Sequence, residues 1–161
     1  MQRITPMLWF DGHAEEAANF YVSVFKKNSK VKQITHYAGE EFPEKKGQVM
    51  TVSFELNGQE FTALNGGPDF KFTQAVSFVI NCDTQEEIDY YWDRLGAGGD
   101  PAAQVCGWLK DKYGLSWQIV PKMLGEMYTK GDPVKAQRAF AAMMQMKKLD
   151  IAALKKAYDG R

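Results

Sequence analysis

The sequence is poor in the residue types that most often mark a function. Of its 161 residues only two are histidine, His13 and His36, and only two are cysteine, Cys82 and Cys106. Two cysteines cannot build a disulfide framework. The opening residues MQRITPMLWF contain neither the apolar stretch nor the small-residue cleavage site of a signal peptide. We therefore expect a cytoplasmic protein with reduced thiols.

An excess of one charge is also lacking. Lys and Arg number 20 and Asp and Glu number 20, so the formal net charge is zero. Without a basic face the chain has no electrostatic footprint for a nucleic acid or an anionic membrane. Nor does any apolar run approach the length of a membrane-spanning helix. We expect neither nucleic acid nor membrane as a partner.

What the sequence does contain is a regular succession of strand and helix patterns. Residues 13–25 repeat apolar positions every three or four residues, which predicts a helix with Glu15 and Glu16 in its first turn. Asn57-Gly58 predicts a hairpin turn, because both residues tolerate a positive φ. The charged residues 39–47 predict an exposed loop. Strands are predicted at residues 4–10, 31–37, 49–56 and 60–65.

The same succession then begins again. Residues 75–81 predict a strand, and Thr84 with Glu87 predicts the capping box of a helix that ends at Gly96. A hairpin follows at residues 106–120. The second half therefore repeats the first, with fewer residues between its helix and its hairpin.

Aligning Glu15-Glu16 with Glu86-Glu87 superposes the apolar positions of the two helices, which supports the repeat. The residues after Pro121 have no counterpart in the first half. There Asp132-Pro133 and Asp150 predict two helix starts, and their apolar faces must cover a sheet of this chain or of a partner. We predict an α+β fold with a first module at residues 1–68, a second at 69–121 and a helical extension at 122–161.

Five segments of the chain together resemble one protein family. They are LWFDGHAEEAANFY, TALNGGP, CDTQEEIDYYWDRL, CGWLKDKYGLSWQIVP and MKKLDIAAL. The resemblance is to the PhnB-like branch of the glyoxalase/bleomycin-resistance/dioxygenase (vicinal oxygen chelate) superfamily, often labelled as a 3-demethylubiquinone-9 3-methyltransferase domain, and it extends into the terminal helices. It implies tandem βαβββ modules, a small-molecule cleft and a homodimer.

The resemblance also implies where a metal would be bound. Enzymes of the superfamily usually hold a divalent ion with His, Gln and Glu on the first and last strands of each module. In this chain those places fall near Met7 or Trp9, near Thr62 or Leu64, at residues 75–77 and at Gln118. None is His, Asp or Glu, and one neutral amide does not offset the dehydration of a divalent ion. We expect no metal site and no cofactor.

The methyltransferase label has little chemical support in the sequence. A nucleoside-type methyl donor is usually held by a glycine-rich turn between a strand and a helix of a parallel sheet. The glycine cluster at residues 96–99 follows a predicted helix instead. We therefore disfavour methyl transfer.

Two kinds of function remain open. A binding protein would hold its ligand on aromatic side chains, while a lyase, isomerase or dioxygenase-type enzyme would need a borrowed metal ligand, or His13 or His36 as a general base. Exposed, structural roles are the simpler interpretation of both histidines. The residues that we expect to bind a ligand are Trp9, Asn65, Trp108, Trp117 and Gln118. For Trp9 a place in the core is an equal alternative, and for Trp108 and Trp117 the core is the simpler interpretation.

The strand that contains Trp117 and Gln118 poses a sharper question. Neighbouring residues of a strand face opposite sides of the sheet, so only one of the two can face the cleft. If that residue is Gln118, it occupies the superfamily's metal position; if it is Trp117, the register is displaced by one residue. We interpret Lys110-Asp111-Lys112 as a solvated turn, and Cys106 as a buried, inert thiol.

Overall fold

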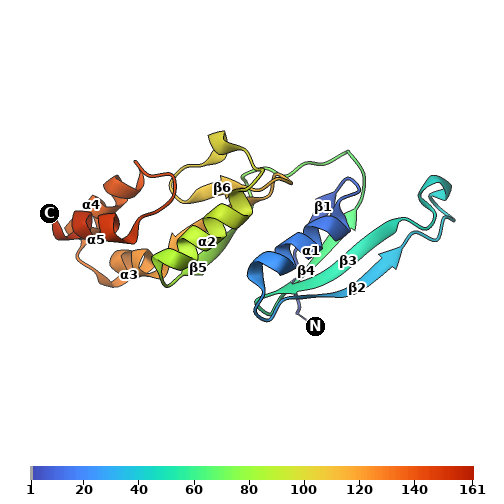
Figure 1. Cartoon of the computed structure of the whole chain (residues 1–161), viewed down its shortest axis with the longest axis horizontal. Helices are drawn as coiled ribbons and strands as arrows, with labels where there is room; N and C mark the ends of the chain where they lie inside the picture. Colours follow the sequence, from blue (N-terminus) through green and yellow to red (C-terminus); the bar gives the residue numbers. More distant parts are fainter. Residues whose placement is uncertain (1) are drawn as a thin grey trace. The chain divides into compact units, whose positions relative to one another are not determined.

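In the computed structural model, which describes residues 2–161, the chain divides between Lys71 and Phe72 into two compact units. Each unit combines one small sheet with helices, which confirms the predicted α+β class (Figure 1). In the described part of the chain no helix combines the length and the apolar character that crossing a membrane requires.

The first unit is a complete βαβββ module. Its sheet has the order β1-β4-β3-β2, with β1 parallel to β4 and the other neighbours antiparallel. The turn between β3 and β4 has φ of 49° at Asn57 and 82° at Gly58, as the hairpin signal predicted. The elements are β1 (Met7–Phe10), α1 (Ala14–Phe25), β2 (Lys30–His36), a 3₁₀ turn (Pro43–Lys45), β3 (Val49–Leu56) and β4 (Gln59–Asn65).

Alternation along the strands builds the core of the first unit. Val52, Phe54 and Leu56 of β3 are buried, and the residues between them are only half-buried. The buried stripe of α1 packs onto this face, where the rings of Tyr21 and Phe54 stack with centroids 6.4 Å apart. The opposite face of the sheet is therefore left without a helix of its own unit.

The second unit has a smaller sheet and more helices. Its three strands have the order β5-β7-β6, with β5 parallel and β6 antiparallel to β7. The helix α2 packs on one face of this sheet (Figure 1). The elements are β5 (Ser77–Cys82), α2 (Gln85–Gly96), a 3₁₀ turn (Pro101–Ala103), β6 (Trp108–Lys110), β7 (Ser116–Pro121), α3 (Lys122–Lys130), α4 (Pro133–Met143) and α5 (Ile151–Asp159).

The repeat is one strand short in the second unit. Two full βαβββ modules were predicted. Within residues 97–107, however, the structure forms a 3₁₀ turn and no strand. The segment is short and rich in glycine, and it folds closely onto β6. A Cβ atom at Gly99 would lie 2.0 Å from the carbonyl oxygen of Lys110, so only glycine fits this approach.

Helix starts follow the sequence closely. Thr84 accepts a hydrogen bond from the N–H of Glu87 at 3.3 Å, while the Glu87 carboxylate accepts one from the N–H of Asp83 at 2.6 Å. The capping box is thus present, except that the Glu87 carboxylate accepts from the N–H of Asp83 and not from that of the N-cap residue Thr84. Asp132 and Asp150 cap α4 and α5 with their side chains, as predicted.

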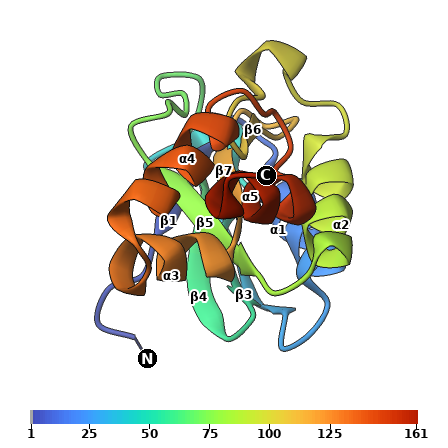
Figure 2. The same cartoon turned by 90° about the vertical axis from the view of Figure 1, so that its left-hand side faces the viewer.

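The helices α3, α4 and α5, which we call the C-terminal extension (residues 122–161), pack within the second unit. Figure 2 shows α4 and α5 side by side. Their core contains Leu124, Ala139, Leu149 and Leu154. The segment between α4 and α5 is fastened to the module, because the N–H groups of Cys106 and Gly107 donate to the carbonyls of Met146 and Lys147, each at 2.8 Å.

Candidate ligand-binding site

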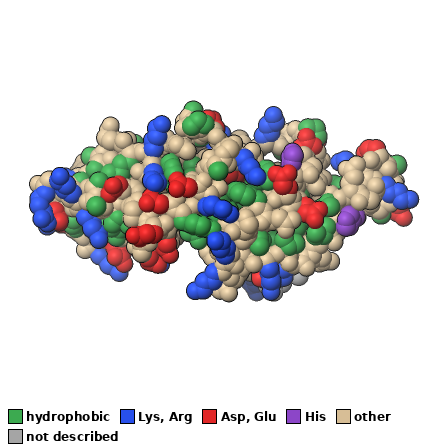
Figure 3. Space-filling view, viewed as in Figure 1, with side chains coloured by type: hydrophobic (Ala, Val, Ile, Leu, Met, Phe, Trp, Pro, Cys, Tyr) green, Lys and Arg blue, Asp and Glu red, His purple; other side chains and the backbone are tan. Residues whose placement is uncertain are grey.

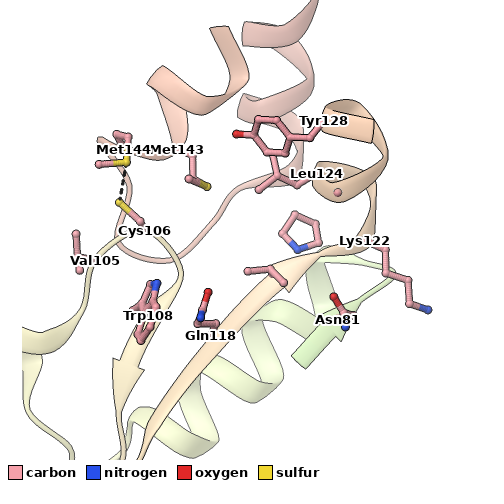
Figure 4. Close-up of a pocket in the computed structure, with 13 residues that line it drawn as sticks. Asn81, Val105, Cys106, Trp108, Gln118, Lys122, Leu124, Tyr128, Met143 and Met144 are labelled. Atoms are coloured by element: carbon pink, nitrogen blue, oxygen red, sulfur yellow. Dashed lines mark hydrogen bonds between the residues drawn. The ribbon is translucent and has the colours of Figure 1, made fainter. Parts of the chain in front are cut away.

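A cavity of about 550 Å³ lies in the second unit, between the sheet and the C-terminal extension. The sheet side, which we call the floor, contributes Trp108 from β6 and Gln118 from β7 (Figure 4). Val120 of β7 also belongs to the floor. The opposite side, which we call the roof, consists of Leu124, Tyr128, Met143 and Met144. The remaining lining residues are Asn81, Val105, Cys106, Pro121, Lys122 and Gly125.

The register of the sheet decides which residue of β7 faces this cavity. Trp117 is 2% exposed, and its ring centroid lies 5.7 Å from that of Phe78, whereas Gln118 is half-buried and lines the cavity. Trp108 is directly opposite Gln118 on the neighbouring strand. Of the two predicted alternatives, the structure therefore has Gln118 on the cavity side and Trp117 in the core.

The amide of Gln118 is oriented by a neighbour on β5. Its Nε2 atom donates a hydrogen bond to Oγ of Ser77 at 2.9 Å. The amide oxygen then points into the cavity, as Figure 4 shows. The floor thus offers one hydrogen-bond acceptor beside the indole ring of Trp108.

The charges around the cavity are balanced. Lys122 is the one charged residue among the thirteen that line it, and its Nζ atom lies 2.7 Å from Oδ1 of Asp83. The hydrogen bond to Asp83 raises the pKa of Lys122, and burial raises the pKa of Tyr128 in the roof. On the face seen in Figure 3, positive and negative side chains are interspersed over the surface. A neutral ligand suits this cavity better than an anion.

The interpretation of residues 110–112 as a solvated turn is wrong for Asp111. Its side chain is 2% exposed. The carboxylate accepts hydrogen bonds from the N–H groups of Tyr113 and Leu115 at 2.9 and 3.1 Å, and from Nε1 of Trp117 at 2.9 Å. An Asp whose side chain accepts from the backbone N–H two residues later is typical of a turn, and so is the glycine at position 114.

Cys106 differs from its expected role as well. The thiol was expected to be buried, but it is half-buried and lines the cavity, with Sγ 3.7 Å from Sδ of Met144. Cys82 is the buried thiol. Burial, with smaller contributions from Glu87 and Asp83, raises its pKa to about 12.

The donors at the expected metal positions do not fit a divalent ion. In the first unit, Met7 pairs with Thr62 and Trp9 with Leu64, so no ionisable side chain is present at those positions. In the second unit the donors at the expected positions, Ser77 and Gln118, are neutral. Ser116, which pairs with Ser77, is neutral too, and its buried hydroxyl has no hydrogen-bond partner in the structure. No three His, Cys, Asp or Glu side chains gather within residues 2–161 in a way that could hold a metal ion. A divalent ion needs charged donors to replace its water.

Trp9 and Asn65, both in the first unit, are occupied by structural contacts. The indole N–H of Trp9 donates to the carbonyl of Gly67 at 2.8 Å, and its ring meets Phe70 edge-on with centroids 4.9 Å apart. Oδ1 of Asn65 accepts from the N–H of Ala14 at 2.9 Å, and its Nδ2 donates to the carbonyl of Val49 at 3.1 Å. Asn65 thereby caps α1 from a distant strand, a role that sequence reasoning missed.

The two histidines are exposed and do not line the cavity. His13 precedes α1, with Nδ1 3.7 Å from a carboxylate oxygen of Glu16. His36 ends β2 beside a hollow of about 270 Å³ that Tyr37 and Phe42 also line.

Comparison with known proteins shows to which family the chain is similar. A family model described as 3-demethylubiquinone-9 3-methyltransferase matches residues 2–120. The match therefore leaves out the terminal helices, which the sequence resemblance had included. A search of curated proteins finds no match.

Solved structures agree with the family match. A PhnB protein from Bacillus cereus, whose description assigns it provisionally to the same methyltransferases, is 42% identical over 74% of this chain and 99% of its own, with a TM-score of 0.63. Protein PA1353 from Pseudomonas aeruginosa is 19% identical over 75% of this chain and 98% of its own, with a TM-score of 0.59. The fosfomycin resistance protein FosX from Listeria monocytogenes, complexed with Mn(II) and sulfate, is 15% identical over 81% and 98%, with a TM-score of 0.52. The last two show a shared fold alone.

Proposed function

Since the chain belongs to the PhnB-like 3-demethylubiquinone-9 3-methyltransferase family of the glyoxalase/bleomycin-resistance superfamily, we propose that it binds a flat, largely apolar small molecule in the cavity of its second unit, without a metal ion. The observation that carries this proposal is the pairing of Trp108 with Gln118 on the floor. An aromatic face beside a single hydrogen-bond acceptor selects flat molecules that have an N–H or O–H group.

The size and chemistry of the cavity support this proposal. A volume of about 550 Å³ is within the range of small-molecule sites, which are mostly apolar with a few placed polar groups. The oxygen of Gln118 is such a group. The hydrogen bond from Nε2 to Ser77 orients the amide, and its oxygen points into the cavity, where it offers the ligand an acceptor.

Binding is favoured over three catalytic alternatives. Methyl transfer from a nucleoside-type donor would need a glycine-rich turn between a parallel strand and a helix. The glycines at 96–99 are instead at the end of α2 and directly after it. A metal-dependent lyase, isomerase or dioxygenase would need charged donors, and the floor offers neutral ones. A metal-free general base would have to come from the described residues that line the cavity, and these include no histidine, aspartate or glutamate.

We test the proposal with matched ligands that differ in one donor. 2-Naphthol has an O–H group, and 2-methoxynaphthalene has the same rings without it; indole and N-methylindole form a second pair. By isothermal titration calorimetry we expect the donor-bearing member of each pair to bind about fivefold more tightly, the effect of one neutral hydrogen bond. In Gln118→Leu the difference within each pair should disappear.

The control is Gln145→Leu, which makes the same substitution at an exposed position of the second unit. It should bind all four molecules as the unmodified protein does. If none of the four binds, or if both members of each pair bind equally to the unmodified protein, the proposal is wrong.

A homodimer remains part of this proposal. The strands β1 and β5 are at the edges of their sheets and expose large apolar side chains, Met7 at 61% and Val79 at 49%. Covering such surfaces with a second copy would remove apolar area from water. Multi-angle light scattering at micromolar concentration should give twice the mass of one chain, and a monomer would contradict this part.

A further inference from the structure

The cavity is built from two parts of the chain that differ in their relation to the family. The family match covers residues 2–120, and the Bacillus cereus protein corresponds over 99% of its own length to only 74% of this chain. The floor residues Trp108, Gln118 and Val120 are inside the matched range. The roof residues Leu124, Tyr128, Met143 and Met144 are all outside it. One side of the cavity therefore lies outside the range that the family model matches.

The two sides also differ in stiffness. Trp108 and Gln118 are paired on adjacent strands, and Gln118 is further fixed by Ser77. The roof contains two methionines, whose unbranched thioether side chains adopt many shapes at low cost. Tyr128 adds an aromatic ring, which meets Phe140 edge-on with centroids 6.3 Å apart.

The roof is nevertheless attached firmly at its far end. The carbonyls of Met146 and Lys147 accept hydrogen bonds from Cys106 and Gly107. The side chain of Gln85 holds the next residues, because Nε2 donates to the carbonyl of Leu149 at 3.1 Å and Oε1 accepts from the N–H of Ile151 at 2.9 Å. The backbone of the roof is thus fixed, and its side chains are the adaptable part.

From these observations we propose that the C-terminal extension determines the size and shape of the ligands that the cavity accepts, while the floor selects for a donor group. This inference rests on the proposed function. The expected ligands are fused-ring apolar molecules with one N–H or O–H donor. Met143 and Met144 would enclose such a ligand from the side opposite Trp108.

The experiment uses the full chain and three probes with one hydroxyl each: phenol, 2-naphthol and 9-phenanthrol. Met143→Trp fills the roof with a bulkier, stiffer side chain. We expect it to weaken 9-phenanthrol binding by about tenfold and phenol binding by less than about twofold, because steric exclusion grows with ligand size. Met144→Trp is a second variant at a position that is 48% exposed, where a larger side chain is tolerated in folding.

Val134→Trp is the matched control, because Val134 is on α4 like Met143, is 66% exposed and does not line the cavity. It should leave the affinity for all three probes within about twofold of the unmodified protein. Gln118→Leu should weaken all three by a similar factor, since each loses the same hydrogen bond.

The outcomes separate this inference from the function on which it rests. If the unmodified protein binds none of the probes, both are overturned. If it binds them and Gln118→Leu weakens them, but Met143→Trp and Met144→Trp leave the ratio of phenol to 9-phenanthrol affinity unchanged, the function stands and the inference about the extension is wrong. A changed ratio in both roof variants, absent from Val134→Trp, supports it.

Discussion

The indole nitrogen of Trp117 donates a hydrogen bond to Oδ2 of Asp111 over a distance of 2.9 Å. Both side chains are 2% exposed, and Oδ1 of the same carboxylate accepts from the backbone N–H groups of Tyr113 and Leu115. Asp111 therefore fixes both the turn before β7 and the first large side chain of that strand. With Trp117 held in the core, the alternation of β7 turns Gln118 toward the cavity.

We predict that Asp111→Ala lowers the free energy of unfolding by about 3 kcal/mol, because three donors, two of them buried, lose their acceptor. Urea denaturation followed by circular dichroism measures this. Asp111→Asn should cost less, since its amide oxygen still accepts. Asp69→Ala, at an exposed position, should change stability by less than about 0.5 kcal/mol. A loss as small for Asp111→Ala as for Asp69→Ala would show that the carboxylate is not needed for the turn.

A second prediction concerns the attachment of the extension at Gly107. This residue has a φ of 84°, and an added Cβ would lie 3.0 Å from the carbonyl oxygen of Ile119 and 3.1 Å from Cδ1 of Leu149. Gly107→Ala should therefore cost about 2 kcal/mol or more through backbone strain and crowding. Limited trypsin digestion should also cleave the extension faster, because its lysines and Arg138 lose protection.

Gly125→Ala is the matched control for that experiment. Gly125 is inside α3, without a positive φ, and a Cβ there would meet nothing within 4 Å. Alanine in a helix interior should raise stability by about 0.5–1 kcal/mol. Equal effects of the two substitutions would contradict the close approach at Gly107.

The two thiols should react very differently. Burial raises the pKa of Cys82 to about 12, whereas an unfolded cysteine titrates near about 8.5. The folded protein thus keeps this proton to higher pH than the unfolded chain. The stability that this thiol contributes is fully present below pH about 8.5 and is lost as the pH rises from there toward 12.

At pH 8 an Ellman-type reagent should therefore modify Cys106 quickly and Cys82 only after denaturant is added. Cys106→Ser should remove the fast reaction and leave the slow one. Two fast thiols in the native protein would show that Cys82 is not protected.

Sequence reasoning went furthest where a signal is local. The hairpin turn at Asn57-Gly58 and the caps at Thr84, Asp132 and Asp150 depend on residues a few positions apart, and the structure has them. The repeat was also visible, because helix and strand periods survive low identity. The prediction of a further strand between α2 and the hairpin of the second module was wrong, because too few residues separate the two.

The site was harder to predict because it depends on contacts across long stretches of sequence. Asn65 caps α1 from 51 positions away, and nothing near Asn65 in the sequence indicates that role. Asp111 was obscured by its lysine neighbours, since flanking charges are typical of a solvated turn. Alternation along β7 limited the choice to Trp117 or Gln118, but periodicity alone does not say which side of a sheet faces a cavity.

The final prediction concerns the metal position itself. Gln118→Glu places a carboxylate at the position where the family resemblance implies a metal-binding glutamate, so it tests whether that one change creates a site. We expect metal affinity to remain weak, because the neighbouring donors Ser77 and Ser116 are neutral hydroxyls, and a single carboxylate does not compensate a divalent ion for its lost water. Calorimetric titration with Mn²⁺ and Zn²⁺ measures this, with Gln145→Glu as the control for an added surface charge. Tight, stoichiometric binding by Gln118→Glu alone would mean that further charged donors converge on this position, and the proposal of a metal-free ligand site would then have to be abandoned.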